Sequence, residues 1–243
     1  MGEVGDKYRL YLVGEGEKDT HWRHGGAPKY DLVNRLFEEE RTKEWPEGSL
    51  EETVQNAIKT WEMELSHKTR LSDFKSINHE KFTLSVNGRK PLTGKGASIS
   101  GEETLSLGSY NAMLETSMPA ELCPKGYYNS KEETFESSHE NFRSAFPRGF
   151  AWEVLEVYSG PPVVALKFRH WGHMEGNFKG HAPTGKMVEF IGIAVLKVDD
   201  QLRAETVEIY YDPAEFMAGL YKGPKLDTAE GSNSSNAQRC PFM

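Results

Sequence analysis

The sequence predicts a single α+β domain, because helical apolar patterns fill most of its first half and extended apolar runs fill its second half. The extended runs cover residues 151–158, 163–171, 187–198 and 202–211, and turns rich in glycine, proline or aspartate separate them. Four consecutive strands with short connections predict an antiparallel sheet. Since most helices precede this sheet along the chain, the layout is that of the α+β class.

The composition indicates a folded, water-soluble protein. Of the 243 residues, 37% are hydrophobic and 11% are aromatic, which is enough to form a sizeable core. A net charge of −8 without a basic cluster argues against a nucleic-acid partner. No apolar run approaches the ~20 residues that span a bilayer, and the N-terminal region lacks the apolar segment of a secretory signal. We therefore expect a cytoplasmic protein without a transmembrane segment.

Residues 1–48 are expected to form an arm that packs on the core. This region mixes Trp22, Tyr30 and Trp45 with turn signals, and it holds one short helical pattern at 32–37. Exposure of these aromatic rings together would be unfavourable, so we expect the rest of the fold to cover them.

Three helices and one strand are expected in the first part of the domain, which we place at residues 49–221. Capping boxes at 49–52 and 100–103 each precede an apolar stripe with helical spacing. Alternation at 82–86 predicts a strand that ends in a tight turn. A third helix is expected between residues 131 and 146, where one stripe carries Phe135, His139, Phe142 and Phe146.

The chain is expected to end in a short helix up to Leu220 and a flexible tail at 222–243, because the tail is too polar to order itself. The last four residues, from Cys240, fit the C-a-a-X form of a prenylation site, and a terminal Met favours farnesyl. The alternative is a chance ending, since proline follows Cys240 and only Arg239 is basic nearby. Prenylation of Cys240 alone would give weak, reversible membrane contact.

Six short segments resemble a known group of proteins. The segments at 146–150 (FPRGF), 168–176 (FRHWGHMEG) and 180–186 (GHAPTGK) are similar to the SnoaL-like branch of the nuclear-transport-factor-2-like superfamily. In that branch a helix ends at a Phe-Pro turn and a Gly-rich hairpin closes with Pro-Thr-Gly. The segments at 14–18, 61–64 and 107–112 look more narrowly like the plant pathogen-related proteins.

The resemblance implies a cone-shaped α+β barrel, in which a curved antiparallel sheet and the helices across it enclose an apolar pocket. Superfamily members include polyketide cyclases, isomerases, dehydratases and proteins that only bind ligands, so the fold does not fix the function. The plant group is associated with defence responses, and the family is compatible with a homodimer formed through the sheet. In the cyclases an Asp-Gly-Lys-Ile turn leads to an Asp. Here residues 199–202 lead to Asp212 with about two extra residues, which indicates a bulge or register shift.

Strand alternation selects residues that we expect to face this pocket. At 163–171 it places Leu166, Phe168 and His170 on the expected interior face. In the last strand, Glu205 shares a face with apolar residues, and desolvation there would raise its pKa. The expected ligand-binding residues are Phe135, His139, Phe142, Leu166 and Phe168.

Two functions are compatible with these residues. The first is a plant defence-associated protein that binds a small hydrophobic metabolite without turnover, as an accessory to specialised metabolism. The alternative is an isomerase or cyclase that acts on a ketone or on a polyketide- or terpenoid-like substrate, with His170 and Glu205 as catalytic acid and base. Each residue also has a structural interpretation: His170 as a core histidine, and Glu205 as a partner of Arg203 or His170.

No metal ion or other cofactor is expected. His170 and His173 form an H-x-x-H pattern, but side chains three residues apart on a strand point to opposite faces. His21 and His24 lack a nearby pattern of acidic or cysteine ligands.

Overall fold

The computed structural model describes residues 6–88, 98–114 and 126–226. Its helices are α1 (Asp31–Glu40), α2 (Leu50–His67), α3 (Gly101–Leu114), α4 (Phe135–Ala145) and α5 (Pro213–Leu220), with short 3-10 turns at Glu15–Glu17 and Leu71–Asp73. Its strands are β1 (Thr83–Val86), β2 (Ile99–Ser100), β3 (Ala151–Ser159), β4 (Val163–His173), β5 (Met187–Val198) and β6 (Ala204–Tyr211). The helices and strands that the sequence predicts are all present among them.

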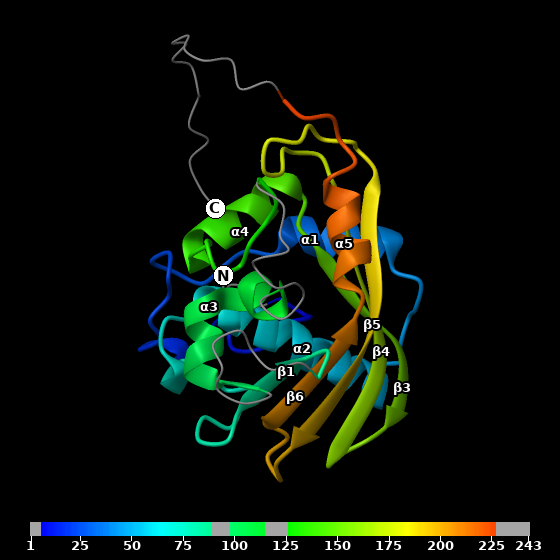
Figure 1. Cartoon of the computed structure of the whole chain (residues 1–243). Helices are drawn as coiled ribbons and strands as arrows, with labels where there is room; N and C mark the ends of the chain where they lie inside the picture. Colours follow the sequence, from blue (N-terminus) through cyan, green and yellow to red (C-terminus); the bar gives the residue numbers. More distant parts are fainter. Residues whose placement is uncertain (1–5, 89–97, 115–125, 227–243) are drawn as a thin grey trace, which may run out of the picture.

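The strands form one six-stranded sheet in the order β2-β1-β6-β5-β4-β3. The pairs from β3 to β6 are antiparallel, as predicted. However, β1 pairs parallel with β6, so the sheet is mixed and the expectation of a wholly antiparallel sheet is corrected. Because a long stretch of chain separates β1 from β6, no hairpin fixes their relative direction. Figure 1 shows the long strands curving along one side of the molecule, with α3 and α4 on the other side and α5 beside β5.

Side-chain caps set the starts of the helices that cover the sheet. The Ser49 hydroxyl accepts a hydrogen bond from the backbone N–H of Glu52 at the start of α2. Before α3, Ser100 and Glu103 exchange hydrogen bonds in the predicted capping box. Thr134 caps α4 in the same way. These caps satisfy amide groups that have no partner inside the helix.

A glycine allows α3 to approach α4 closely. Gly108 interrupts α3 with a φ of 77°, a conformation that side chains other than glycine rarely adopt. A Cβ atom at this position would lie 2.7 Å from the His139 side chain and 2.8 Å from that of Phe135. Gly108 therefore brings the second half of α3 against the face of α4 that carries His139.

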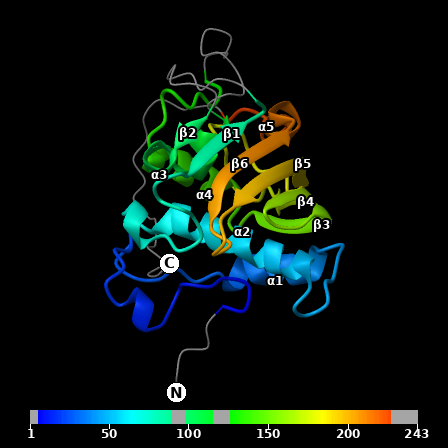
Figure 2. The ribbon, with the colours of Figure 1, turned by 90° about the horizontal axis from the view of Figure 1, so that it is seen from below.

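Different parts of the chain cover the two faces of β3 and β4. Ala151 pairs with Trp171, and both pack in one buried cluster with Phe37 of α1. The next pair along, Trp152 with His170, points to the opposite face because neighbouring strand residues alternate. Figure 2 shows α1 and α2 side by side below this end of the sheet.

Buried charged groups connect the N-terminal region to β3 and to the end of α2. The Glu153 carboxylate is fully buried and accepts hydrogen bonds from the backbone N–H and the hydroxyl of Thr42, at 2.8 and 3.1 Å. It also lies 3.3 Å from the Arg169 guanidinium. In a second buried contact, Lys68, the residue directly after α2, lies 2.9 Å from Glu17. Removal of the N-terminal region would deprive the Glu153 carboxylate of three donors, the two of Thr42 and the backbone N–H of Lys43.

Among the described residues, no helix is both long and apolar enough to cross a membrane. Cys240, with all of the expected tail beyond residue 226, lies outside the described residues. Within the described part, the backbone of residues 224–226 hydrogen-bonds to that of residues 180–182.

Lys59 is a completely buried lysine in the middle of α2. Its Nζ has no hydrogen-bond partner among the described residues, and it lies 3.0 Å from the ring centroid of Phe37 and 4.4 Å from that of Tyr8. Burial lowers the pKa of the Lys59 ammonium to about 6. The attraction of the two rings for a cation offsets only part of the lost hydration.

We predict that Lys59→Met stabilises the protein by roughly 1–4 kcal/mol at neutral pH, because an apolar side chain avoids the cost of burying the amine. Between pH 6 and 10.5 the unfolded chain binds more protons at Lys59 than the folded chain does, so the free energy of unfolding rises with pH in this window. Lys59→Met should lose that part of the slope. Urea unfolding at about pH 6 and about pH 9 measures both effects, with the exposed Lys75→Met as control. A variant less stable than the wild type would contradict the prediction.

Candidate functional site

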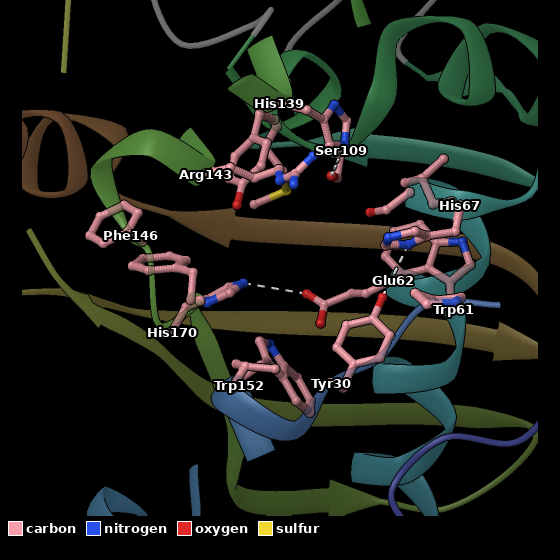
Figure 3. A pocket seen from close by; sticks show the side chains of 18 of the residues that line it. Tyr30, Trp61, Glu62, His67, Ser109, His139, Arg143, Phe146, Trp152 and His170 are labelled. Carbon is pink, nitrogen blue, oxygen red and sulfur yellow. Dashed lines mark hydrogen bonds and ion pairs between the residues drawn. The ribbon is translucent and has the colours of Figure 1, made fainter. Parts of the chain in front are cut away.

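A cavity of about 1230 Å³ lies between the sheet and the helices (Figure 3). Side chains of β1 and of β3 to β6 line one side, and side chains of α2, α3 and α4 line the other. Residues of α1, of the segment before it and of the turn at 146–150 also line the cavity. The volume is somewhat above the range for small-molecule sites, roughly 300–1,000 Å³.

The sheet provides an apolar floor, because alternation brings every second side chain of each strand to this face. The floor residues are Leu84, Trp152, Phe168, Phe190, Ala194, Leu196, Val207, Ile209 and Tyr211, joined by Phe216 of α5. The Phe190 ring packs against the rings of Tyr211 and Phe216, at centroid distances of 4.7 and 5.1 Å. Aromatic packing of this kind provides a large surface for the apolar part of a ligand.

His170 and Glu62 meet inside the cavity. His170 Nε2 lies 3.3 Å from Glu62 Oε1, which extends from α2. The imidazole stacks on the Phe150 ring at a centroid distance of 4.3 Å. His170 Nδ1 is buried and has no hydrogen-bond partner among the described residues. Because the carboxylate can only accept, the proton of a neutral imidazole belongs on Nε2 in this arrangement.

A second polar region of the cavity contains His139 and His67. His139 Nδ1 lies 2.8 Å from the Phe135 carbonyl oxygen, so Nδ1 donates and Nε2 is left as an acceptor. The Ser109 hydroxyl lies 3.5 Å from that Nε2. Burial lowers the pKa of both imidazoles to about 4, so both are neutral at pH 7. The Tyr30 hydroxyl lies 3.2 Å from His67 Nδ1.

The structure brings four of the expected site residues to the cavity. Phe135, His139, Phe168 and His170 all line it. His173, by contrast, faces away from this group and contacts Glu40 of α1 at 2.9 Å, as strand alternation predicts.

Phe142 and Leu166 do not line the cavity, although the sequence suggested that they would. Both are fully buried in the main hydrophobic core. The Phe142 ring stacks on that of Tyr110 at a centroid distance of 4.0 Å and also contacts Phe178. Other side chains separate Phe142 and Leu166 from the cavity, so these two residues pack behind the residues that line it.

Glu205 is not at the cavity, and the expected pair with His170 is not formed. A β-bulge at the start of β6 leaves Glu205 out of the regular pairing, so strand alternation does not hold there. Its carboxylate lies 2.7 Å from Lys81 Nζ and 3.0 Å from Lys197 Nζ. Hydrogen bonds from Lys81 and Lys197 lower the pKa of Glu205, where desolvation was expected to raise it.

Glu62 is the carboxylate that sequence reasoning missed. It occupies the helical position four residues after Ile58, and both residues line the cavity with Leu65. Glu62 therefore interrupts an otherwise apolar stripe of α2, and this interruption is the signal that could have identified it.

Within residues 6–88, 98–114 and 126–226, no group of three histidine, cysteine or acidic side chains could hold a metal ion.

The chain is similar to known proteins in sequence and in structure, although no family model matches it. It is 51% identical over 241 residues to the pathogen-related protein of Hordeum vulgare, and the alignment covers 98% of this chain and 95% of the barley protein.

Three solved structures show distant likeness. A putative polyketide cyclase from Streptomyces antibioticus is 14% identical with a TM-score of 0.38, covering 68% of this chain and 96% of that one. A ketosteroid isomerase-like protein from Catenulispora acidiphila is 10% identical with a TM-score of 0.37, covering 69% and 93%. A putative SnoaL-like polyketide cyclase from Jannaschia sp. CCS1 is 15% identical with a TM-score of 0.36, covering 61% and 76%. Likeness at this level carries no information about activity.

We predict that His139 and His67 titrate near pH 4, and that Arg143→Gln raises both pKa values, because the Arg143 charge disfavours both imidazolium forms. Both values should stay below the ordinary 6.5, since burial is the larger cause. NMR titration of the imidazole protons measures this. Arg35→Gln, which removes an exposed charge of α1 outside the cavity lining, is the control. Unchanged midpoints in Arg143→Gln would contradict the prediction.

Proposed function

Since the chain belongs to the family of pathogen-related proteins, we propose that it acts in plant defence by binding a small hydrophobic metabolite in its cavity, as an accessory to specialised metabolism. The name of the barley relative, pathogen-related protein, supports the proposed role in plant defence. The observation that carries the binding proposal is the cavity of about 1230 Å³ with its floor of aromatic and aliphatic side chains.

The size of the cavity sets the affinity that we expect. A ligand of about 20 non-hydrogen atoms gains roughly 0.3 kcal/mol per atom, or about 6 kcal/mol in total. This free energy corresponds to a dissociation constant in the range of tens of micromolar. Binding of this strength needs no covalent step or metal ion.

A second candidate is acid–base catalysis by His170, favoured by the 3.3 Å contact between its Nε2 and Glu62. Glu62 would orient the imidazole, and His170 would move a proton at a carbon next to a ketone. The reaction class is that of an isomerase or cyclase on a polyketide- or terpenoid-like substrate. Glu205 has no part in this proposal.

We predict that filling the cavity abolishes binding. Ala194→Phe places a ring in the middle of the floor and should weaken the binding of Nile red, a neutral apolar dye, at least tenfold. Ala57→Phe, on an exposed face of α2, should bind as the wild type does. Fluorescence titration measures the affinities, and melting curves show whether each variant is folded. If Ala194→Phe does not fold, Val207→Phe tests the same floor. The binding proposal fails if the wild type does not bind the dye or if folded cavity variants bind it normally.

For the catalytic candidate, we predict that the wild type accelerates exchange of the α-hydrogens of 2-decalone in D₂O. His170→Ala and Glu62→Gln should abolish this acceleration and leave affinity for the ketone within about tenfold, because groups that act on the transition state need not hold the ground state. His173→Ala is the matched control on the opposite face of β4. Exchange followed by NMR at no more than the buffer rate would exclude this candidate while leaving the binding proposal intact.

A further inference from the structure

We infer that the cavity selects an amphipathic ligand with one carboxylate, which Arg143 of α4 binds while the hydrocarbon body lies on the sheet floor. This inference rests on the proposed binding function and names the class of ligand.

Among the described residues, Arg143 is the one arginine of the cavity lining that has no acidic partner. Within the ranges that the structure describes, no hydrogen bond or ion pair to its guanidinium is found, and its side chain is exposed. The other lining arginines each lie close to a carboxylate, in the pairs Arg9–Asp6, Arg23–Glu136 and Arg148–Glu175. A guanidinium without a protein partner is free to bind a carboxylate through two parallel hydrogen bonds.

The helix geometry directs Arg143 to the same region as His139. The two residues are four positions apart on α4, so they share one face of the helix. Figure 3 shows Arg143, His139 and Ser109 together in one part of the cavity, apart from His170 and Trp152.

The neighbours of Arg143 do not compete with it for an anion. His67 and His139 are neutral at pH 7, because burial lowers the pKa of each to about 4. Burial raises the pKa of Tyr110, so its hydroxyl keeps its proton and can donate a hydrogen bond. A carboxylate at Arg143 would therefore meet the guanidinium charge and a neutral hydrogen-bond donor, and the two imidazoles would add no charge.

The acidic residues of the same helix do not neutralise this position. Glu136 lies 3.6 Å from Arg23, and Glu140 accepts a hydrogen bond from Ser144 at 3.0 Å. Both glutamates are exposed, where water and salt screen their charges. Among the arginines of the lining, Arg143 is therefore the one best placed to bind a carboxylate of the ligand.

The test compares three probes that share one hydrocarbon chain: decanoate, methyl decanoate and decanol. Quenching of the tryptophan fluorescence, to which the lining residues Trp61 and Trp152 contribute, reports binding at about pH 7.5. The wild type should bind decanoate at least tenfold more tightly than the ester or the alcohol, because only the carboxylate forms charge-assisted hydrogen bonds. Arg143→Gln should remove this preference by weakening decanoate alone. Arg35→Gln, which deletes the same charge on α1, should keep the preference.

Two results would overturn the inference. One is equal affinity of the wild type for decanoate and its methyl ester, and the other is an unchanged preference in folded Arg143→Gln. The Nile red titration distinguishes these from a failure of the proposed function. If the wild type binds the dye but shows no preference for the carboxylate, the cavity binds apolar ligands and only the carboxylate inference fails. If it binds neither the dye nor decanoate, both proposals fail.

Discussion

The register of β4 in the sheet is the constraint on which the cavity and the packing of α1 both depend. His170 and Trp171 are neighbours on this strand and face opposite sides. A slip of one residue would exchange them. The imidazole would then lose its contact with Glu62 in the cavity, and the Trp171 indole would lose its hydrogen bond to Glu40 of α1. Because both faces are occupied by specific polar partners, the strand has one acceptable register.

The helical wall opposite the sheet depends on the approach of α3 to α4. Without the left-handed backbone at Gly108, the first turn after the kink could not place Ser109 and Tyr110 next to His139. Close packing on this wall also explains why His139 is neutral. Its ring lies between that of Phe135, at a centroid distance of 4.0 Å, and that of Tyr110, at 5.5 Å, so little water can hydrate an imidazolium.

The sequence predicted most of the fold and only part of the site, and the difference has a physical basis. Along β4 the pleat is regular, so alternation placed His170 on the correct face. At the start of β6 a bulge breaks that rule. The two extra residues between the turn at 199–202 and Asp212 indicated a bulge or register shift. They did not show that Glu205 would contact Lys81 and Lys197, which come from other parts of the chain. In the same way, Glu62 interrupts the apolar stripe of α2, but only the structure shows that it contacts the His170 imidazole across the cavity.

The polar groups of the cavity differ in what they need from a ligand. His170 and Glu62 contact each other at 3.3 Å, so part of the cost of their desolvation is already offset within the protein. Such a pair can remain in an apolar site whether or not anything binds there. Arg143 has no such partner among the described residues, and a ligand that displaced water from it without supplying an acceptor would raise the free energy of the complex. The region near α4 therefore disfavours a ligand group without an acceptor, whereas the sheet floor accepts apolar groups. This difference would orient a bound ligand with its polar end toward α4.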